Sequence, residues 1–157
     1  MGCYQTILVA LDGSRDAEAA LKHAAILARD QHARLILLTV VPTGSPQILT
    51  PGGATPSPAE REAVFRQSLR EAVDRLPPDV GVESRLAHGR AAPRILETAE
   101  ACRCDLIVMG FHGHGRLHHA LVGSVSGSVL RQSRLPVLLM RAAEPVPAVA
   151  GATIATA

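Results

Sequence analysis

Short apolar runs alternate along the chain with longer segments whose alanines and leucines recur at helical spacing. Residues 4–11, YQTILVAL, favour a strand and end at the polar triplet DGS, which predicts a turn and the start of a helix. Residues 33–41 form a second run without polar alternation, as expected of a strand that is covered on both faces. Further strands are predicted at 80–87, 105–109 and 137–140.

A helix is predicted in each interval between these strands. Ser14 or Asp16 is the expected N-cap of the first helix. The second starts at SPAE, residues 57–60, which combines a serine cap, a first-turn proline and a glutamate at the third position. The helices are expected at about 16–29, 57–76, 92–102 and 124–132. This alternation predicts an α/β fold with a parallel sheet and right-handed crossovers.

Two segments interrupt the pattern. Residues 42–60 are dense in Pro, Gly, Ser and Thr and predict a loop longer than most connections, either mobile or a lid. The chain after Ala142 consists mostly of small residues and proline, and we expect it to be poorly ordered. Since 157 residues suit one domain with a buried core, we expect a single domain over residues 1–143 and a flexible tail over 144–157.

Composition narrows the range of partners. Hydrophobic residues make up 47% of the chain and charged residues 19%, which indicates a globular protein rather than a disordered one. Aromatic residues make up only 2%, so few side chains could stack on bases. The 16 Lys and Arg residues are scattered at a net charge of +2, and we therefore expect no nucleic-acid partner.

The cysteines indicate a reducing compartment. Cys3, Cys102 and Cys104 are odd in number and lack the spacing of a disulfide framework. Cys102 is expected at a helix end and Cys104 just before a strand, rather than in a metal site. No signal-peptide pattern is seen, and the apolar runs are shorter than the roughly 20 residues that span a bilayer. We expect a cytoplasmic protein without a membrane partner.

Glycines recur after the predicted strand at 105–109, at Gly110, Gly113 and Gly123. Ligands of doubly wound sheets bind at the carboxyl ends of strands, where the strand order reverses. If the order is 3-2-1-4-5, this segment and the turn at Asp12 open into one crevice. Gly110 and Gly113 are expected to adopt positive φ and to let the backbone approach a phosphate.

The helix that starts at Gly123-Ser124 supplies the other half of this candidate site. The N–H groups of residues 123–126 lie at a helix N-terminus, where the helix dipole favours an anion, and the hydroxyls of Ser124 and Ser126 can add donors. The cluster suits a diphosphate or triphosphate, with Asp12 opposite for a ribose hydroxyl or a divalent metal. The spacing is neither that of a Walker loop nor that of the dinucleotide fingerprint.

Four segments, ILVALDGS, DLIVMGFHGHG, GSVSGSVL and LPVLLMR, resemble the universal stress protein family in this order. The Gly-x2-Gly-x9-Gly-Ser spacing is similar to the nucleotide-binding motif of the family's ATP-binding branch. The resemblance covers roughly residues 4–141. It implies a single-domain, five-stranded parallel sheet of order 3-2-1-4-5 with helices on both faces, Rossmann-like and adenine nucleotide alpha hydrolase-like.

The resemblance also implies a ligand and a homodimer. ATP, with Mg²⁺ or Mn²⁺, would lie in the crevice, where the backbone of Val40 and Val41 would meet adenine. Ala10 and Met109 would line the pocket. The other expected contacts are Asp12, Gly110, Gly113, Gly123, Ser124, Val125 and Ser126. Family members form homodimers by pairing their last strands. An apolar edge strand near Val137–Met140 independently favours a homodimer, because an uncovered edge of this kind is prone to pair with other chains.

Several of these residues also have a plainer interpretation. Asp12 can cap its own turn through the backbone, as Asp before Gly often does. Ser126 and Ser128 can be helix-surface residues facing solvent, and Arg116 can lie near phosphate or in water. For the loop histidines we favour exposed or phosphate-adjacent imidazoles over metal ligands, because no nearby carboxylate or thiol completes a set. These are His112, His114, His118 and His119.

Three functions are compatible with this pattern. The first is a small cytoplasmic ATP-binding protein of the stress response, a nucleotide-dependent regulator or binding module that acts as a homodimer with an unidentified protein partner. The second is a slow ATPase or autophosphorylating protein, which is less favoured because Asp12 is the one acidic residue placed in the crevice. The third is a dimeric interaction module that needs no nucleotide.

Overall fold

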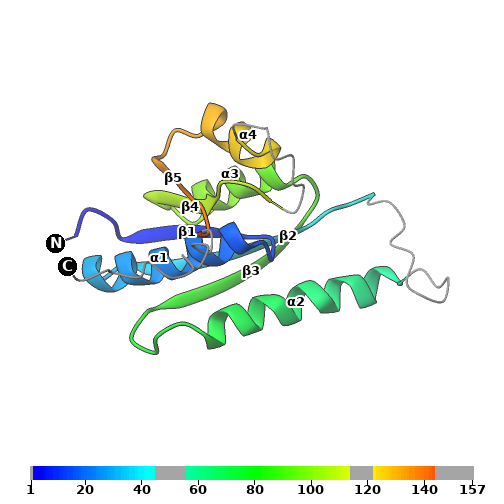
Figure 1. Ribbon diagram of the computed structural model, residues 1–157, viewed down its shortest axis with the longest axis horizontal. Helices are drawn as coiled ribbons and strands as arrows, with labels where there is room; N and C mark the ends of the chain where they lie inside the picture. The colour runs from blue at the N-terminus through cyan, green and yellow to red at the C-terminus, as the bar shows by residue number, and fades with distance from the viewer. Residues whose placement is uncertain (1, 45–55, 114–121, 144–157) are drawn as a thin grey trace, which may run out of the picture.

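The chain alternates strand and helix, as its apolar pattern predicts. The computed structural model describes residues 2–44, 56–113 and 122–143. The strands are β1 (Thr6–Leu11), β2 (Arg34–Val41), β3 (Val82–His88), β4 (Leu106–Gly110) and β5 (Val137–Met140). The helices are α1 (Arg15–Gln31), α2 (Pro58–Asp74), α3 (Ala91–Ala101) and α4 (Ser124–Gln132). The strands form one parallel sheet of order β3-β2-β1-β4-β5, which confirms the expected fold (Figure 1).

The predicted capping residues explain where two helices begin. Ser14 is the N-cap of α1, and its side chain accepts a hydrogen bond from the Ala17 amide, so the alternative assignment to Asp16 is wrong. Ser57 and Glu60 form the expected capping box at α2, each side chain accepting from the other residue's backbone amide. The Glu60 carboxylate accepts a hydrogen bond from the Ser57 amide, and this hydrogen bond lowers the pKa of that carboxyl.

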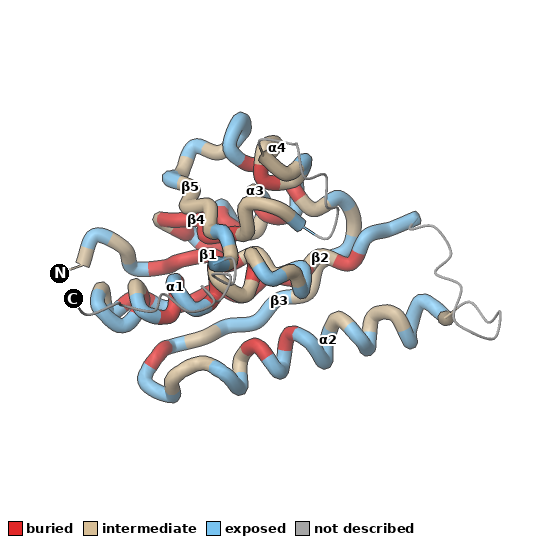
Figure 2. Tube along the Cα trace, in the orientation of Figure 1, coloured by how far each residue is buried: buried red, intermediate tan, exposed pale blue. Residues whose placement is uncertain are grey.

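The two faces of the sheet bury separate cores. Along β1, Ile7 and Val9 pack with α1 and α2, whereas Leu8 packs with α3 and α4. Figure 1 shows these helix pairs on opposite sides of the sheet. Successive side chains of a strand point to opposite faces, so a strand covered on both faces reads as one apolar run. Figure 2 shows β1 and β4 largely buried, while β3 at the sheet edge is more exposed.

Side chains tether the amino end of β1 to the neighbouring segments. Asp105 Oδ2 accepts hydrogen bonds from the amides of Gln5, at 2.7 Å, and Thr6, at 2.9 Å. The Arg34 guanidinium donates to the Thr6 hydroxyl at 3.1 Å. The first strand was predicted from residue 4; it begins at Thr6, where these side-chain contacts give way to the backbone ladder.

At the opposite, carboxyl edge the strand order reverses at β1. Ala10 pairs with Leu38 of β2 and with Met109 of β4, so the turns after β1 and β4 leave the sheet side by side. The predictions for the tail at 144–157 and for most of the loop at 42–60 lie outside the described residues. Within the described part of the chain, no helix is both long and apolar enough to cross a membrane.

Candidate functional site

A cavity of about 320 Å³ opens at the carboxyl ends of β1, β2 and β4. It lies where the strand order reverses, the usual place for a ligand in a doubly wound sheet. Its volume is at the lower end of the range of small-molecule sites, roughly 300–1,000 Å³. The cavity is lined by Ala10, Leu11, Asp12, Leu38, Val40, Ala91, Ile95, Met109, Gly110, His112, Gly113, Gly123, Ser124, Val125 and Ser126.

The structure gathers around this cavity every residue predicted for the site except Val41. Val40 lines it, and the next side chain along a strand must point to the opposite face. Leu11, Leu38, Ala91 and Ile95 were not predicted, and His112 was expected only as an exposed or phosphate-adjacent side chain. Ile95 lies on the buried face of α3 with Ala92 and Ala99, and this helical spacing of apolar residues indicates a core position rather than a ligand contact.

The glycines serve close packing rather than an unusual backbone conformation. The expectation of positive φ at Gly110 and Gly113 is wrong, since neither has φ between +20° and +160°. A Cβ on Gly110 would lie 2.9 Å from the Ala17 amide nitrogen and 3.0 Å from the carbonyl carbon of Asp16. The end of β4 therefore approaches the first turn of α1 more closely than any side chain allows.

Asp12 caps its own turn, as the plainer of its two interpretations predicts. It also faces the cavity. Its Oδ1 accepts a hydrogen bond from the Ser14 amide at 2.9 Å, closing the turn after β1. Its Oδ2 would lie 2.7 Å from a Cβ on Gly113. The absence of a side chain at Gly113 thus leaves room for the carboxylate at the cavity wall.

Helix α4 directs its N-terminus at the same cavity. Its N-cap is Gly123, which has no side chain to satisfy the first-turn amides. Ser126 is buried, and its Oγ lies 2.8 Å from the Phe111 carbonyl oxygen and 3.1 Å from that of Gly123. The interpretation of Ser126 as a solvent-facing residue is therefore wrong, and its hydroxyl donates to a protein carbonyl instead of adding a donor for phosphate.

Asp16 has a role that the sequence did not indicate. Its Oδ2 accepts from the His112 amide at 3.0 Å and lies 3.5 Å from Nδ1 of the same histidine. Its Oδ1 accepts from the Ala142 amide at 2.8 Å. The first turn of α1 is thereby joined to the segment after β4 and to the segment after β5.

Of the loop histidines, only His112 lies in a described part of the chain. Its ring meets Phe111 edge-on, with the ring centroids 4.7 Å apart, and the Arg141 guanidinium lies 4.1 Å from the Phe111 ring centre. The other predictions, for His114, Arg116, His118 and His119, lie outside the described residues. Within those residues, no group of three or more His, Cys, Asp or Glu side chains could hold a metal ion.

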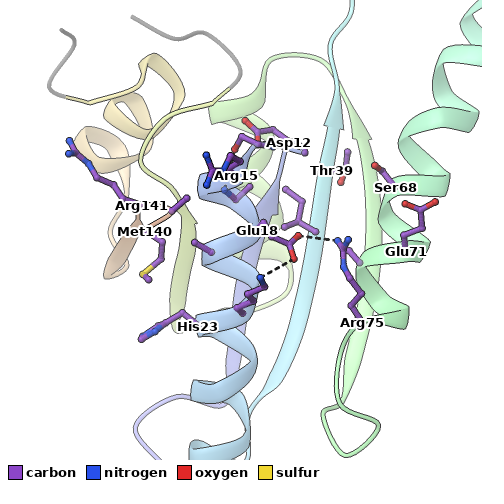
Figure 3. Close-up of a pocket in the computed structure, with 18 of the residues that line it drawn as sticks. Asp12, Arg15, Glu18, His23, Thr39, Ser68, Glu71, Arg75, Met140 and Arg141 are labelled. Atoms are coloured by element: carbon purple, nitrogen blue, oxygen red, sulfur yellow. Dashed lines mark hydrogen bonds and ion pairs between the residues drawn. The ribbon is translucent and has the colours of Figure 1, made fainter. Parts of the chain in front are cut away.

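A larger cavity of about 1,070 Å³ lies between α1 and α2 (Figure 3). Figure 3 shows Glu18 pointing across it toward Arg75, the C-cap of α2. One Glu18 carboxylate oxygen lies 3.1 Å from the Arg75 guanidinium and the other lies 3.9 Å from the Lys22 ammonium. Asp12 lines both cavities. Acidic and basic side chains alternate along the larger cavity, so its charges do not converge on an anion as the helix N-terminus does at the smaller one.

The cysteines lie where they were predicted. Cys102 is the C-cap of α3 and Cys104 precedes β4. All three thiols are free; Cys3 is exposed, and Cys102 and Cys104 are buried. Burial raises the pKa of the Cys104 thiol to about 12, which keeps it protonated and unreactive near neutral pH.

The fold and the cavity define a doubly wound α/β protein with a candidate anion site at its switch point. The chain belongs to the universal stress protein family, whose pattern it matches over residues 3–141. It is 31% identical over 141 residues to a universal stress protein of Methanocaldococcus jannaschii, covering 88% of this chain and 82% of the relative. It is 33% identical over 139 residues to one of Synechocystis sp., covering 87% and 85%.

Solved structures agree with this assignment. A protein of the family from Burkholderia pseudomallei is 35% identical with a TM-score of 0.63, covering 87% of this chain and 96% of that one. A universal stress protein solved in complex with cAMP is 29% identical with a TM-score of 0.68, covering 89% and 98%. The resemblance inferred from the sequence is thus confirmed for family and fold.

Proposed function

We propose that this chain binds ATP, with Mg²⁺ or Mn²⁺, in the cavity at the carboxyl edge of the sheet, and acts as a nucleotide-dependent regulator or binding module of the stress response. The observation that carries the proposal is the convergence of the turn after β1, the glycines after β4 and the N-terminus of α4 on one cavity. The cAMP complex of a family member supports a nucleotide as the ligand class.

The chemistry of the lining assigns a part of the nucleotide to each wall. The first-turn amides of α4, at Ser124 and Val125, would donate to phosphate oxygens, since that turn has no side-chain cap. The apolar wall formed by Val40, Ile95 and Met109 would accept the adenine ring. Asp12 directly follows β1, which lies between β2 and β4 in the sheet, and would accept a ribose hydroxyl or hold the metal.

The donor set suits a divalent cation bound together with the nucleotide. Magnesium in nucleotide sites is held by one or two carboxylates and the substrate phosphates, with waters completing the shell. The cavity wall offers one carboxylate, Asp12, in its described lining. The metal would neutralise phosphate charge and orient the polyphosphate against the α4 N-terminus.

Binding, rather than catalysis, is the role we assign to the site. Asp12 is the single carboxylate among the described lining residues, and one of its oxygens already closes the turn to Ser14. Fast hydrolysis needs a base placed to orient the attacking water, and a carboxylate with these duties is poorly placed for that. Phosphate release by wild type and Asp12→Asn tests the alternative of a slow ATPase.

We further propose a cytoplasmic homodimer that pairs β5 edge to edge and acts on an unidentified protein partner. Strand β5 pairs only with β4 within the described sheet. The carbonyls of Pro136 and Met140 accept from β4 and the segment after it, so strand alternation directs the Leu139 amide to the open edge. The three free thiols suit a reducing compartment.

Calorimetric titration tests the nucleotide proposal. Wild-type protein is titrated with ATP and Mg²⁺ and, separately, with cAMP, beside Asp12→Asn, Gly113→Val and Gly123→Val. Asp30→Asn is the matched control. It removes the same charge as Asp12→Asn, but from an exposed position near the C-terminal end of α1. We expect the three site variants to bind more weakly and the control to bind as wild type. Wild-type protein that binds neither nucleotide at millimolar concentration would leave only the nucleotide-independent module.

A further inference from the structure

The Asp16 carboxylate lies behind the candidate nucleotide site, not in it. It is absent from the described lining of the cavity, and its side chain is only 16% exposed. The groups it holds are the amide of His112, which lines the cavity, and the amide of Ala142, two residues beyond β5. These partners are 96 and 126 residues away in the sequence.

Both oxygens of the carboxylate are used, each on a different segment. Hydrogen bonds from amides to a carboxylate are shorter and stronger than those between neutral groups. The position in the first turn of α1 favours a negative charge, which the helix dipole stabilises. The first turn of α1 therefore fixes the segment after β4 and the segment after β5 in place relative to each other.

Two further contacts make these segments a continuous unit. The Phe111 amide donates to the Met140 carbonyl at 2.8 Å, and the Arg141 guanidinium lies over the Phe111 ring. Residues 111–113 and 140–142 thus lie side by side, with the Asp16 carboxylate bridging them at one end. The Asp16 carboxylate adds to these contacts a direct bridge between the His112 and Ala142 amides, so a displacement of the cavity wall at His112 reaches Ala142 more strongly while both of its hydrogen bonds hold.

We propose that Asp16 is a positioning residue that ties the His112–Gly113 wall of the cavity to the chain leaving β5, and so makes Ala142 respond to ligand in the cavity. The inference rests on the proposed function, because it takes the cavity as the nucleotide site. It assigns a route by which nucleotide state reaches β5, the edge strand of the sheet. Asp16 binds no nucleotide itself and acts through the backbone of His112.

Two substitutions separate the contacts of the carboxylate. Asp16→Asn keeps one carbonyl oxygen as acceptor and places an amide donor where the second acceptor was, so one of the two hydrogen bonds is lost. Asp16→Ala loses both. Asp30→Asn again serves as the charge-matched control on the same helix.

Amide exchange followed by NMR on the nucleotide-free proteins tests the positioning role. We expect the protection of the His112 and Ala142 amides to fall by about tenfold or more in Asp16→Ala, as expected for hydrogen bonds to a charged group. In Asp16→Asn at least one of the two should lose protection. The core amide of Val9 should keep its protection in both variants, which shows that the sheet is intact. Unchanged protection at both sites in Asp16→Ala would overturn the inference.

A titration with ATP and Mg²⁺, and another with cAMP, tests the coupling. In wild type we expect the Ala142 amide resonance to shift with nucleotide, and in Asp16→Ala to shift clearly less even when nucleotide saturates the cavity. A purely structural role would weaken binding but leave the response at saturation. An equal Ala142 response in both proteins, or none in a wild type that binds nucleotide, refutes the coupling. If wild type binds neither nucleotide, the proposed function and the coupling fail together, while the exchange data still decide whether Asp16 holds the two segments.

Discussion

Gly110 and Gly113 lie three residues apart on the same segment, yet an added methyl group should affect the protein differently at each. In Gly110→Ala the new Cβ would lie 2.9 Å from the Ala17 amide nitrogen and 3.0 Å from both the carbonyl carbon and the Cβ of Asp16. These atoms belong to the first turn of α1, which Ser14 caps and where Ala17 is buried. They cannot move without shifting the helix, so we expect a loss of about 1–3 kcal/mol in the free energy of unfolding.

In Gly113→Ala the new Cβ would meet, among the described residues, only the Asp12 carboxylate, with Oδ2 at 2.7 Å and Cγ at 4.0 Å. That group is the end of a flexible side chain and can rotate away. Rotation weakens the hydrogen bond from the Ser14 amide. Because weakening one hydrogen bond has a small cost, we expect the free energy of unfolding to fall by no more than about 1 kcal/mol. It also moves the carboxylate from the place where we propose that it meets nucleotide, so ATP affinity should fall.

Urea denaturation and calorimetric titration with ATP and Mg²⁺ compare the two variants. For a chain of this size 1 kcal/mol corresponds to roughly 2–4 °C in Tm, so thermal unfolding gives a second reading for Gly110→Ala. We expect a large stability loss at Gly110 and, at Gly113, a weaker affinity with a small stability loss. A Gly110→Ala protein as stable as wild type would refute the close-packing argument, and unimpaired ATP binding by Gly113→Ala would refute the assignment of Asp12.

Three further predictions follow from local contacts. Ser57→Ala removes the capping box of α2 and should lower the free energy of unfolding by about 1 kcal/mol in urea denaturation; no loss would mean that the cap is not formed in solution. Leu139→Pro removes an outward amide of β5 and should shift a dimer to monomer in light scattering, while Leu139→Ala, which keeps the amide, should not; equal masses would contradict edge pairing. At about pH 8 iodoacetamide should label Cys3 and leave Cys104 unmodified until urea is added, because burial raises the pKa of that thiol to about 12; labelling of native Cys104 would show that the site is open.

The elements were predictable because their signals are local. The bounds of α4 and β5 agree with the expected 124–132 and 137–140, and the capping box at Ser57 fixed the start of α2. Most of the site was predictable for a related reason: turn residues after β1 and β4 meet whenever the strand order is 3-2-1-4-5.

What could not be predicted depends on contacts between distant segments. The sequence gives no sign that Asp16 accepts amides 96 and 126 residues away, nor that the Ser126 hydroxyl bonds the Phe111 carbonyl. The conformation of Gly110 was misjudged because its need for glycine comes from the proximity of α1, which no local pattern records. Val40 and Val41 are both expected to offer backbone to adenine, and of the two Val40 lines the cavity.

The Asp105 and Arg34 contacts tether the amino end of β1, at the end opposite the candidate nucleotide site. A protein engineer could therefore vary Ser124 and Val125, in the first turn of α4, to alter ligand preference while leaving these anchors, the Asp12 turn and the Ser14 cap intact. Such libraries should retain folded members in high proportion, because the proposed ligand contacts and the tethering of the first strand lie at opposite edges of the sheet.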